Sequence, residues 1–195
     1  AAIIPVSDVT IENVGLNPLR DGIFETLGEM GADIQITNLR LQAGEQVGDV
    51  QVRGGLLKGI EVPPSRAISM IDEYPVLFVA AAMAAGTTTM RGLEELRVKE
   101  SDRIDAMAKG LRANGVTVDE GEDWWSVEGL GIDGVPGGES CDSVLDHRIA
   151  MSFMVMGMGS RNPVSVNDGG PIATSFPIFE SLMGNLGARL TRNNQ

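Results

Sequence analysis

An internal repeat constrains the fold of this chain more than any other feature. Three segments share a pattern in which an amphipathic helical stretch is followed by a glycine and then by an alternating, strand-like stretch. They are LRDGIFETLGEMGADIQI (19–36), SDRIDAMAKGLRANGVTV (101–118) and SFPIFESLMGNLGARL (175–190). The pivot glycines, Gly31, Gly115 and Gly187, stand where a left-handed residue ends a helix. We therefore expect a domain built from equivalent supersecondary units.

Strand-like segments surround each repeated helix. They precede it at 9–14, 87–93 and 163–168, and a further strand closes the first two units at 49–55 and 124–129. Two stretches that are apolar nearly all round, at about 74–85 and 147–158, then link one unit to the next. Such helices are expected to be buried. The pattern predicts an α/β (α+β) domain of repeated βαββ units with buried linking helices.

The first residues, AAIIP, share the layout of AAMAAGTTTMRGL at 81–93. We interpret them as the last turn of a linking helix that began earlier in a longer chain. The alternative is a naturally short first unit. Residues 1–195 are expected to form a single domain.

Charge and composition exclude several classes of function. A net charge of −12 argues against a nucleic-acid partner, which would require a cationic surface. No apolar run reaches the roughly 18 residues that a membrane span needs. The single cysteine, Cys141, cannot form an internal disulfide, which fits a reducing, cytoplasmic location without excluding secretion.

Cations stand at predicted helix starts, where the helix dipole favours acids instead. They are Arg20, Arg103 and Arg148, with Lys99 just outside. A bound phosphate or carboxylate would bridge such a cation to the free N–H groups. If equivalent helix ends converge, Arg103, Lys99 and Arg148 form one anion site.

Each arginine also has a local interpretation. The expected helix caps are Asn17, Ser101 and Asp146. The local ion-pair partners are Asp102 or Asp105 for Arg103, Asp146 for Arg148 and Asp21 for Arg20. For Arg20, a local pair or a solvated side chain is the favoured interpretation.

Two acids and the only histidine complete the set of candidates. Asp72 either caps the linking helix or acts as a carboxylate that moves protons, and the two roles are compatible. Glu100 is either an ordinary early-helix acid or an acid/base beside an anion pocket. His147 either caps locally or joins the site next to Arg148.

Four motifs in order give the chain a family resemblance. SMIDEYPVL (69–77), RVKESDRI (97–104), LDHRIAMSFMVMG (145–157) and IATSFPIFESLMGNLGA (172–188) resemble 5-enolpyruvylshikimate-3-phosphate synthase, from Ala1 to about Leu190. The variants IDEYP and ATSFP resemble the bacterial group known for glyphosate-tolerant members. Many relatives have a lysine where this chain has Thr174, so one expected cation is absent.

The resemblance implies a transferase that moves the enolpyruvyl group of phosphoenolpyruvate to the 5-hydroxyl of shikimate 3-phosphate and needs no cofactor or metal. It implies two similar domains with the site between them, of which this chain is the C-terminal one. The implied catalytic residues are Asp72, Glu100 and Lys99, and the implied substrate-binding residues are Asp72, Lys99, Arg103, Arg148 and His147. Without the N-terminal domain, the chain is expected to turn over poorly or not at all.

Two other functions stay open. One is an enolpyruvyl transferase acting on UDP-N-acetylglucosamine. That enzyme usually relies on a reactive cysteine, and Cys141 shows no sign of activation in its loop. The other is a noncatalytic binding module that kept the fold.

Overall fold

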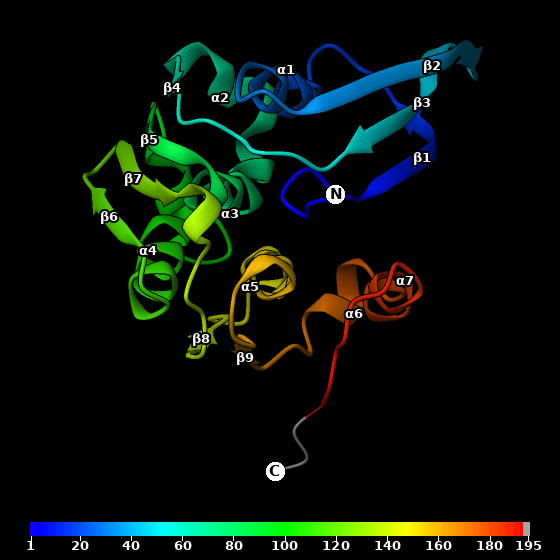
Figure 1. Cartoon of the computed structure of the whole chain (residues 1–195). Helices are drawn as coiled ribbons and strands as arrows, with labels where there is room; N and C mark the ends of the chain where they lie inside the picture. Colours follow the sequence, from blue (N-terminus) through cyan, green and yellow to red (C-terminus); the bar gives the residue numbers. More distant parts are fainter. Residues whose placement is uncertain (193–195) are drawn as a thin grey trace.

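The computed structural model describes residues 1–192, and its first two units have the same topology (Figure 1). Unit one comprises β1 (Asp8–Gly15), α1 (Gly22–Glu29), β2 (Asp33–Gln42) and β3 (Glu45–Arg53). Unit two comprises β5 (Ala85–Arg91), α4 (Arg103–Ala113), β6 (Thr117–Glu120) and β7 (Trp124–Leu130). The sheet orders are β1-β3-β2 and β4-β5-β7-β6, so the last strand of each unit pairs antiparallel with the other two. The predicted repeat is confirmed.

The third unit is shorter than the other two. It contains β9 (Ser165–Asn167), α6 (Ile172–Ser175) and α7 (Phe179–Asn185). The predicted continuous helix is split, because Phe176 leaves the helical region and Pro177 has no N–H to donate. Residues 188–192 are irregular, so the strand expected after Gly187 is wrong for that part of the chain.

The connections add short strands that the periodicity did not predict. β4 (Glu61–Val62) pairs parallel with β5, and β8 (Ser140–Asp142) pairs parallel with β9. The remaining short elements are the 3-10 turns η1 (Pro64–Arg66), η2 (Ile71–Glu73), η3 (Glu94–Val98) and η4 (Gly131–Asp133), and the helix α2 (Ala67–Met70).

The pivot glycines are confirmed. Gly31, Gly115 and Gly187 have φ values of 94°, 84° and 99°, which L residues with a side chain rarely adopt. Each lets the chain reverse direction directly after a helix.

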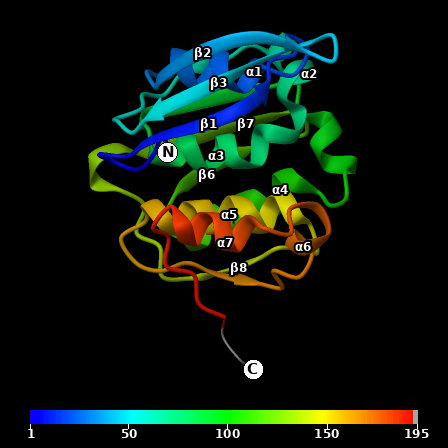
Figure 2. The same cartoon turned by 90° about the vertical axis from the view of Figure 1, so that its right-hand side faces the viewer.

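Of the two linking helices, α3 (Tyr74–Met83) is buried as predicted, whereas α5 (His147–Gly159) has only five of its thirteen residues buried. α3 has nine of its ten residues buried, and it packs against α5 and β7. Phe78 of α3 stacks on Trp125 of β7 with ring centroids 4.0 Å apart. Figure 2 shows α3, α5 and α7 in layers below the first sheet. None of the helices in residues 1–192 has the length and apolar character needed to cross a membrane.

Local predictions at helix starts were less accurate. Residues 1–7 form turns, with the Ile4 N–H donating to the Ala1 carbonyl at 2.9 Å, and no helical turn is assigned there. Asp102, not Ser101, caps α4 by accepting from the Asp105 N–H. Asn17 does not cap α1, which begins only at Gly22.

One ion pair lies inside the core. The Arg103 side chain is 1% exposed and that of Asp146 is 0% exposed, with Nε and Oδ2 2.9 Å apart. Asp146 also caps α5, as predicted, by accepting from the Arg148 N–H at 2.8 Å, and it accepts from the Ser101 hydroxyl at 3.1 Å. Burial acts to raise the pKa of Asp146, but the hydrogen bonds from Arg103, the Arg148 N–H and Ser101 outweigh it and lower that pKa.

We predict that Asp146→Asn lowers the free energy of unfolding by about 3–5 kcal/mol, because it removes the buried carboxylate that compensates the charge of Arg103 at Nε, while the amide oxygen keeps the cap. Urea unfolding at neutral pH measures the change. Asp105→Asn removes a carboxylate from the exposed Lys109 pair, and this control should cost less than about 1 kcal/mol.

The same pair of variants gives a pH test. A carboxyl whose folded-state pKa is lowered stabilises the protein above its unfolded-state pKa, and this contribution is lost as the pH falls through the folded-state value. The stability gap between wild type and Asp146→Asn should therefore shrink in acid. A gap that stays constant down to the acid transition contradicts the assignment.

Candidate functional site

Three arginines from separate elements meet at the carboxylate of Asp72. Asp72 lies in η2, just before α3, with its side chain 24% exposed. Its Oδ2 is 3.3 Å from Arg20 Nη2 and 3.7 Å from Arg148 Nη2, and its Oδ1 is 3.4 Å from Arg103 Nη1. Arg103 and Arg148 therefore converge as predicted, Lys99 does not contact Asp72, and Arg20, for which a local role was favoured, joins the cluster.

The backbone of Asp72 is held as well. Arg148 Nη1 donates to the Asp72 carbonyl at 2.9 Å, although the two residues are 76 positions apart. The carboxylate makes no cap hydrogen bond to α3, so the predicted capping role is wrong. Asp72 instead joins the three arginines.

The electrostatics of Asp72 favour its ionised form. Partial burial acts to raise the pKa of Asp72, but the positive charges of Arg148, Lys99, Arg20 and Arg103 together lower it below its ordinary value. Asp72 is therefore a carboxylate at neutral pH, able to accept a proton.

Arg103 contacts three carboxylates with its three nitrogen atoms. Nε contacts Asp146, Nη1 contacts Asp72, and Nη2 lies 2.5 Å from Glu100 Oε2. The Glu100 side chain is 55% exposed, unlike that of Asp146. Arg103 thus has one buried partner and one that faces solvent.

None of the arginine side chains forms the local ion pairs considered from the sequence. Within residues 1–192, Arg103 does not pair with Asp102 or Asp105, Arg148 does not pair with the side chain of Asp146, and Arg20 does not pair with Asp21. Carboxylates that are mostly distant in the sequence take the place of the predicted anion.

The other predicted site residues lie near this cluster or away from it. Lys99 pairs with Glu95, one helical turn earlier, and its charge still acts on Asp72. His147 is the half-buried first residue of α5, next to Arg148. Thr174 is exposed in α6, and its hydroxyl donates to the Pro171 carbonyl at 2.7 Å.

Arg97 organises the loop that carries Lys99 and Glu100, a role not predicted from the sequence. Its Nη1 donates to Asp102 at 2.9 and 3.2 Å, and its Nη2 donates to Glu120 at 3.2 Å. It also donates to the carbonyl of Glu122 at 3.1 Å and to that of Gly121. Arg97 therefore ties both ends of the 97–102 loop to the β6–β7 turn. Its place at the start of RVKESDR is the only sequence signal for this role.

Cys141 has no features of a reactive thiol. It is 1% exposed, and burial raises its pKa to about 12 although Asn114 donates to Sγ at 3.2 Å. The thiol is therefore protonated at neutral pH and is not a nucleophile.

Comparisons with known proteins identify the family of the chain. The family model for EPSP synthase (3-phosphoshikimate 1-carboxyvinyltransferase) matches residues 1–183. The 3-phosphoshikimate 1-carboxyvinyltransferases of Ruegeria sp. and Roseobacter denitrificans are 67% and 63% identical over all 195 residues. The chain spans only 43% of the length of each.

Solved structures show the same relationship. EPSP synthase from Acinetobacter baumannii superposes with a TM-score of 0.93 at 43% identity, over 96% of this chain and 43% of that one. The enolpyruvyl transferase NikO from Streptomyces tendae has a TM-score of 0.72 at 18% identity, over 97% of this chain and 41% of that one, and it shares the fold alone. The chain therefore belongs to the EPSP synthase family.

Proposed function

We propose that this chain is the C-terminal domain of an enzyme that transfers the enolpyruvyl group of phosphoenolpyruvate to the 5-hydroxyl of shikimate 3-phosphate and releases phosphate. The observation that carries the proposal is the ionised Asp72 within three arginines, with Glu100 on the same guanidinium as Asp72. The arginines can bind the charged groups of an anionic donor, and the two carboxylates can transfer protons.

The two carboxylates divide the proton transfers between them. Asp72 accepts the proton of the 5-hydroxyl as that oxygen bonds to C2 of phosphoenolpyruvate. Glu100, once displaced from Arg103 and protonated from solvent, gives a proton to the C3 methylene, which becomes a methyl group. In the second step Glu100 takes a proton back from the methyl group, the double bond reforms and the bond from C2 to the phosphate oxygen breaks. The proton held by Asp72 leaves with the phosphate, which restores the carboxylate. Lys99 and the arginines stabilise the charge on the departing phosphate.

Arg103 and Arg148 are the proposed donors to the phosphate and carboxylate of phosphoenolpyruvate, with His147 beside them. Both arginines now contact protein carboxylates. An entering anion replaces Glu100 at Arg103 Nη2, because Glu100 is exposed and its pairing is screened by solvent. The exchange places the anion on the arginine and frees Glu100 to transfer protons.

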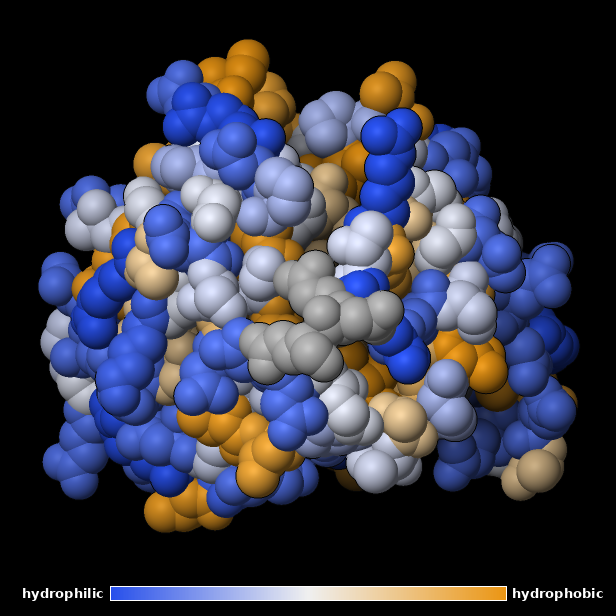
Figure 3. Space-filling view, turned by 90° about the horizontal axis from the view of Figure 1, so that it is seen from below, coloured by the Kyte–Doolittle hydropathy of each residue, from blue (hydrophilic) through white to orange (hydrophobic). Residues whose placement is uncertain are grey.

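The rest of the site is proposed to come from outside the chain. In residues 1–192 the β8–β9 sheet has no counterparts of β6 and β7, so the third unit lacks its second half. Figure 3 views the molecule from the side of β8 and β9, where separate hydrophobic patches lie among hydrophilic residues. We propose that an N-terminal domain and a further short segment complete this unit and the substrate cleft.

The resemblance to the bacterial group known for glyphosate-tolerant members stays a prediction.

The site favours shikimate 3-phosphate over a UDP-sugar acceptor. An enolpyruvyl transfer that relies on a cysteine needs an accessible thiolate, and Cys141 is buried and protonated. The acidic groups at the site are the carboxylates of Asp72 and Glu100, which serve an addition–elimination without a thiol.

We predict that a chimera will be active. This chain replaces the matching 43% of the Ruegeria sp. enzyme, and phosphate release is measured with both substrates. The chimera should turn over, whereas the chain alone should release no phosphate above background, because it supplies one side of the cleft only. A chain that is active alone contradicts the domain assignment. A folded but inactive chimera that binds neither substrate supports a noncatalytic module.

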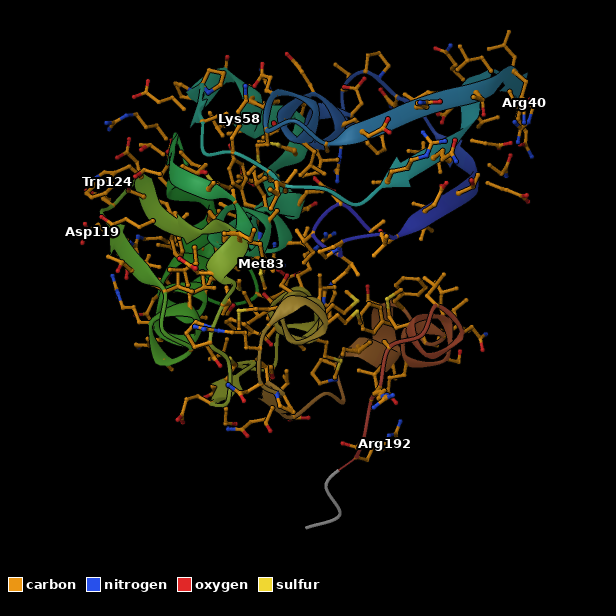
Figure 4. All side chains as sticks on the ribbon, in the orientation of Figure 1. Arg40, Lys58, Met83, Asp119, Trp124 and Arg192 are labelled. Atoms are coloured by element: carbon orange, nitrogen blue, oxygen red, sulfur yellow. The ribbon has the colours of Figure 1, made fainter. Side chains whose placement is uncertain are left out.

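We also predict that Asp72→Asn and Glu100→Gln in the chimera each lower kcat by about 10²–10⁴-fold, because each keeps the shape but removes a proton-transfer group. Asp119→Asn is the control, since this side chain lies at the outer edge of β6 (Figure 4). Single-turnover measurements separate chemistry from substrate binding. Unchanged chemistry in either variant removes that residue from its proposed role.

A further inference from the structure

We infer that Arg20 is a positioning residue for Asp72, holding its carboxylate in the orientation that accepts the proton. The inference rests on the proposed function and adds a residue of the first unit to it. Arg20 is distinct from the arginines proposed to bind phosphoenolpyruvate, because it alone among the three bridges Asp72 to Glu73 in the part of the chain that the structure describes.

The chain presents Arg20 from a fixed turn. The Asn17 side chain accepts from the Leu19 N–H at 2.9 Å, and the Asn17 carbonyl accepts from the Arg20 N–H at 2.8 Å. The turn is anchored to the first sheet by the Leu16 N–H, which donates to the Gln46 carbonyl at 2.9 Å. Arg20 therefore extends towards η2 from a well-determined backbone, although its side chain is 51% exposed.

The two oxygens of Asp72 depend on different arginines. Oδ1 accepts from Arg103 at 3.4 Å, and Oδ2 accepts from Arg20 at 3.3 Å. Arg148 Nη2 is 3.7 Å from Oδ2, which is beyond hydrogen-bond distance. Among the described residues, Arg20 is thus the side chain that hydrogen-bonds Oδ2, and its loss leaves the carboxylate hydrogen-bonded by side chains at Oδ1 alone, with a weaker constraint on its rotation about the bond to Cβ.

Arg20 also separates two neighbouring acids. Its Nη2 lies 3.2 Å from Glu73 Oε1 as well as 3.3 Å from Asp72 Oδ2. Without this bridge the charge of Glu73 would disfavour an ionised Asp72. The charged groups that act on Asp72 are Arg20 before α1, Glu73 in η2, Lys99 and Arg103 in unit two, and Arg148 in α5.

The first arm of the test measures the pKa of Asp72 in this chain from carboxyl ¹³C shifts. Arg20→Gln should raise that pKa, because it removes a positive charge and a hydrogen bond from the ionised form. Arg20→Lys should raise it less. Arg53→Gln is the matched control: Arg53 also bridges two carboxylates, Asp8 at 3.2 Å and Asp33 at 3.1 Å, and it should leave the pKa of Asp72 unchanged.

The second arm measures kcat and KM against pH in the active chimera. Arg20→Gln should move the acid limb of the kcat profile to higher pH and lower kcat roughly three- to tenfold with little change in KM. A purely structural role would not move the acid limb. If Arg20→Gln leaves the pKa of Asp72 at its wild-type value, or leaves the acid limb of the kcat profile at its wild-type pH, the inference is overturned. If the chimera without any substitution is inactive, the proposed function is overturned instead. The pKa measurement in this chain then still tests whether Arg20 acts on the carboxylate of Asp72.

Discussion

The buried pair of Arg103 and Asp146 fixes the geometry on which the rest of the site depends. With side chains 1% and 0% exposed, neither charge can be solvated, so each requires the other. Asp146 is fixed in turn by the first turn of α5, whose Arg148 N–H it accepts. The Arg103 guanidinium is therefore anchored at Nε, and its two other nitrogens are directed at Asp72 and Glu100. The pair's importance is positional, since such pairs often contribute little net stability.

The repeat explains why so many cations are found where a helix dipole disfavours them. Arg103 at the start of α4, Arg148 at the start of α5 and Arg20 in the turn before α1 meet at Asp72. Arginines there are compensated by carboxylates from other units, mainly by Asp72 in the connection between units one and two. The unfavourable local placement is thus a consequence of building one site from several repeats.

Much of the fold was predictable because it follows from local periodicity. The burial of α3 needs only an apolar circumference, and the left-handed glycines need only a helix that ends in a reversal of the chain. Partners were not predictable in this way. Arg20 and Asp72 are 52 positions apart, and no pattern near Arg20 indicates that contact. The N-cap of α4 is Asp102 and not the predicted Ser101 for a similar reason, because the Ser101 hydroxyl donates to the distant Asp146. The misplaced charges at helix starts pointed to Arg103, Lys99 and Arg148, and the motif resemblance assigned roles to these and the other candidate residues.

Of the three carboxylates on Arg103, Asp146 and Glu100 differ most in exposure, and this difference makes Glu100 the exchangeable one. Asp146 has no solvent contact and accepts from three donors, so displacing it would leave several buried groups unsatisfied. Glu100 is 55% exposed, and water can replace its single arginine contact at little cost. Under the proposed function, an anion arriving from solvent would compete with Glu100 and leave Asp146 in place. The same guanidinium would then be structural on its buried side and would bind the ligand on its open side.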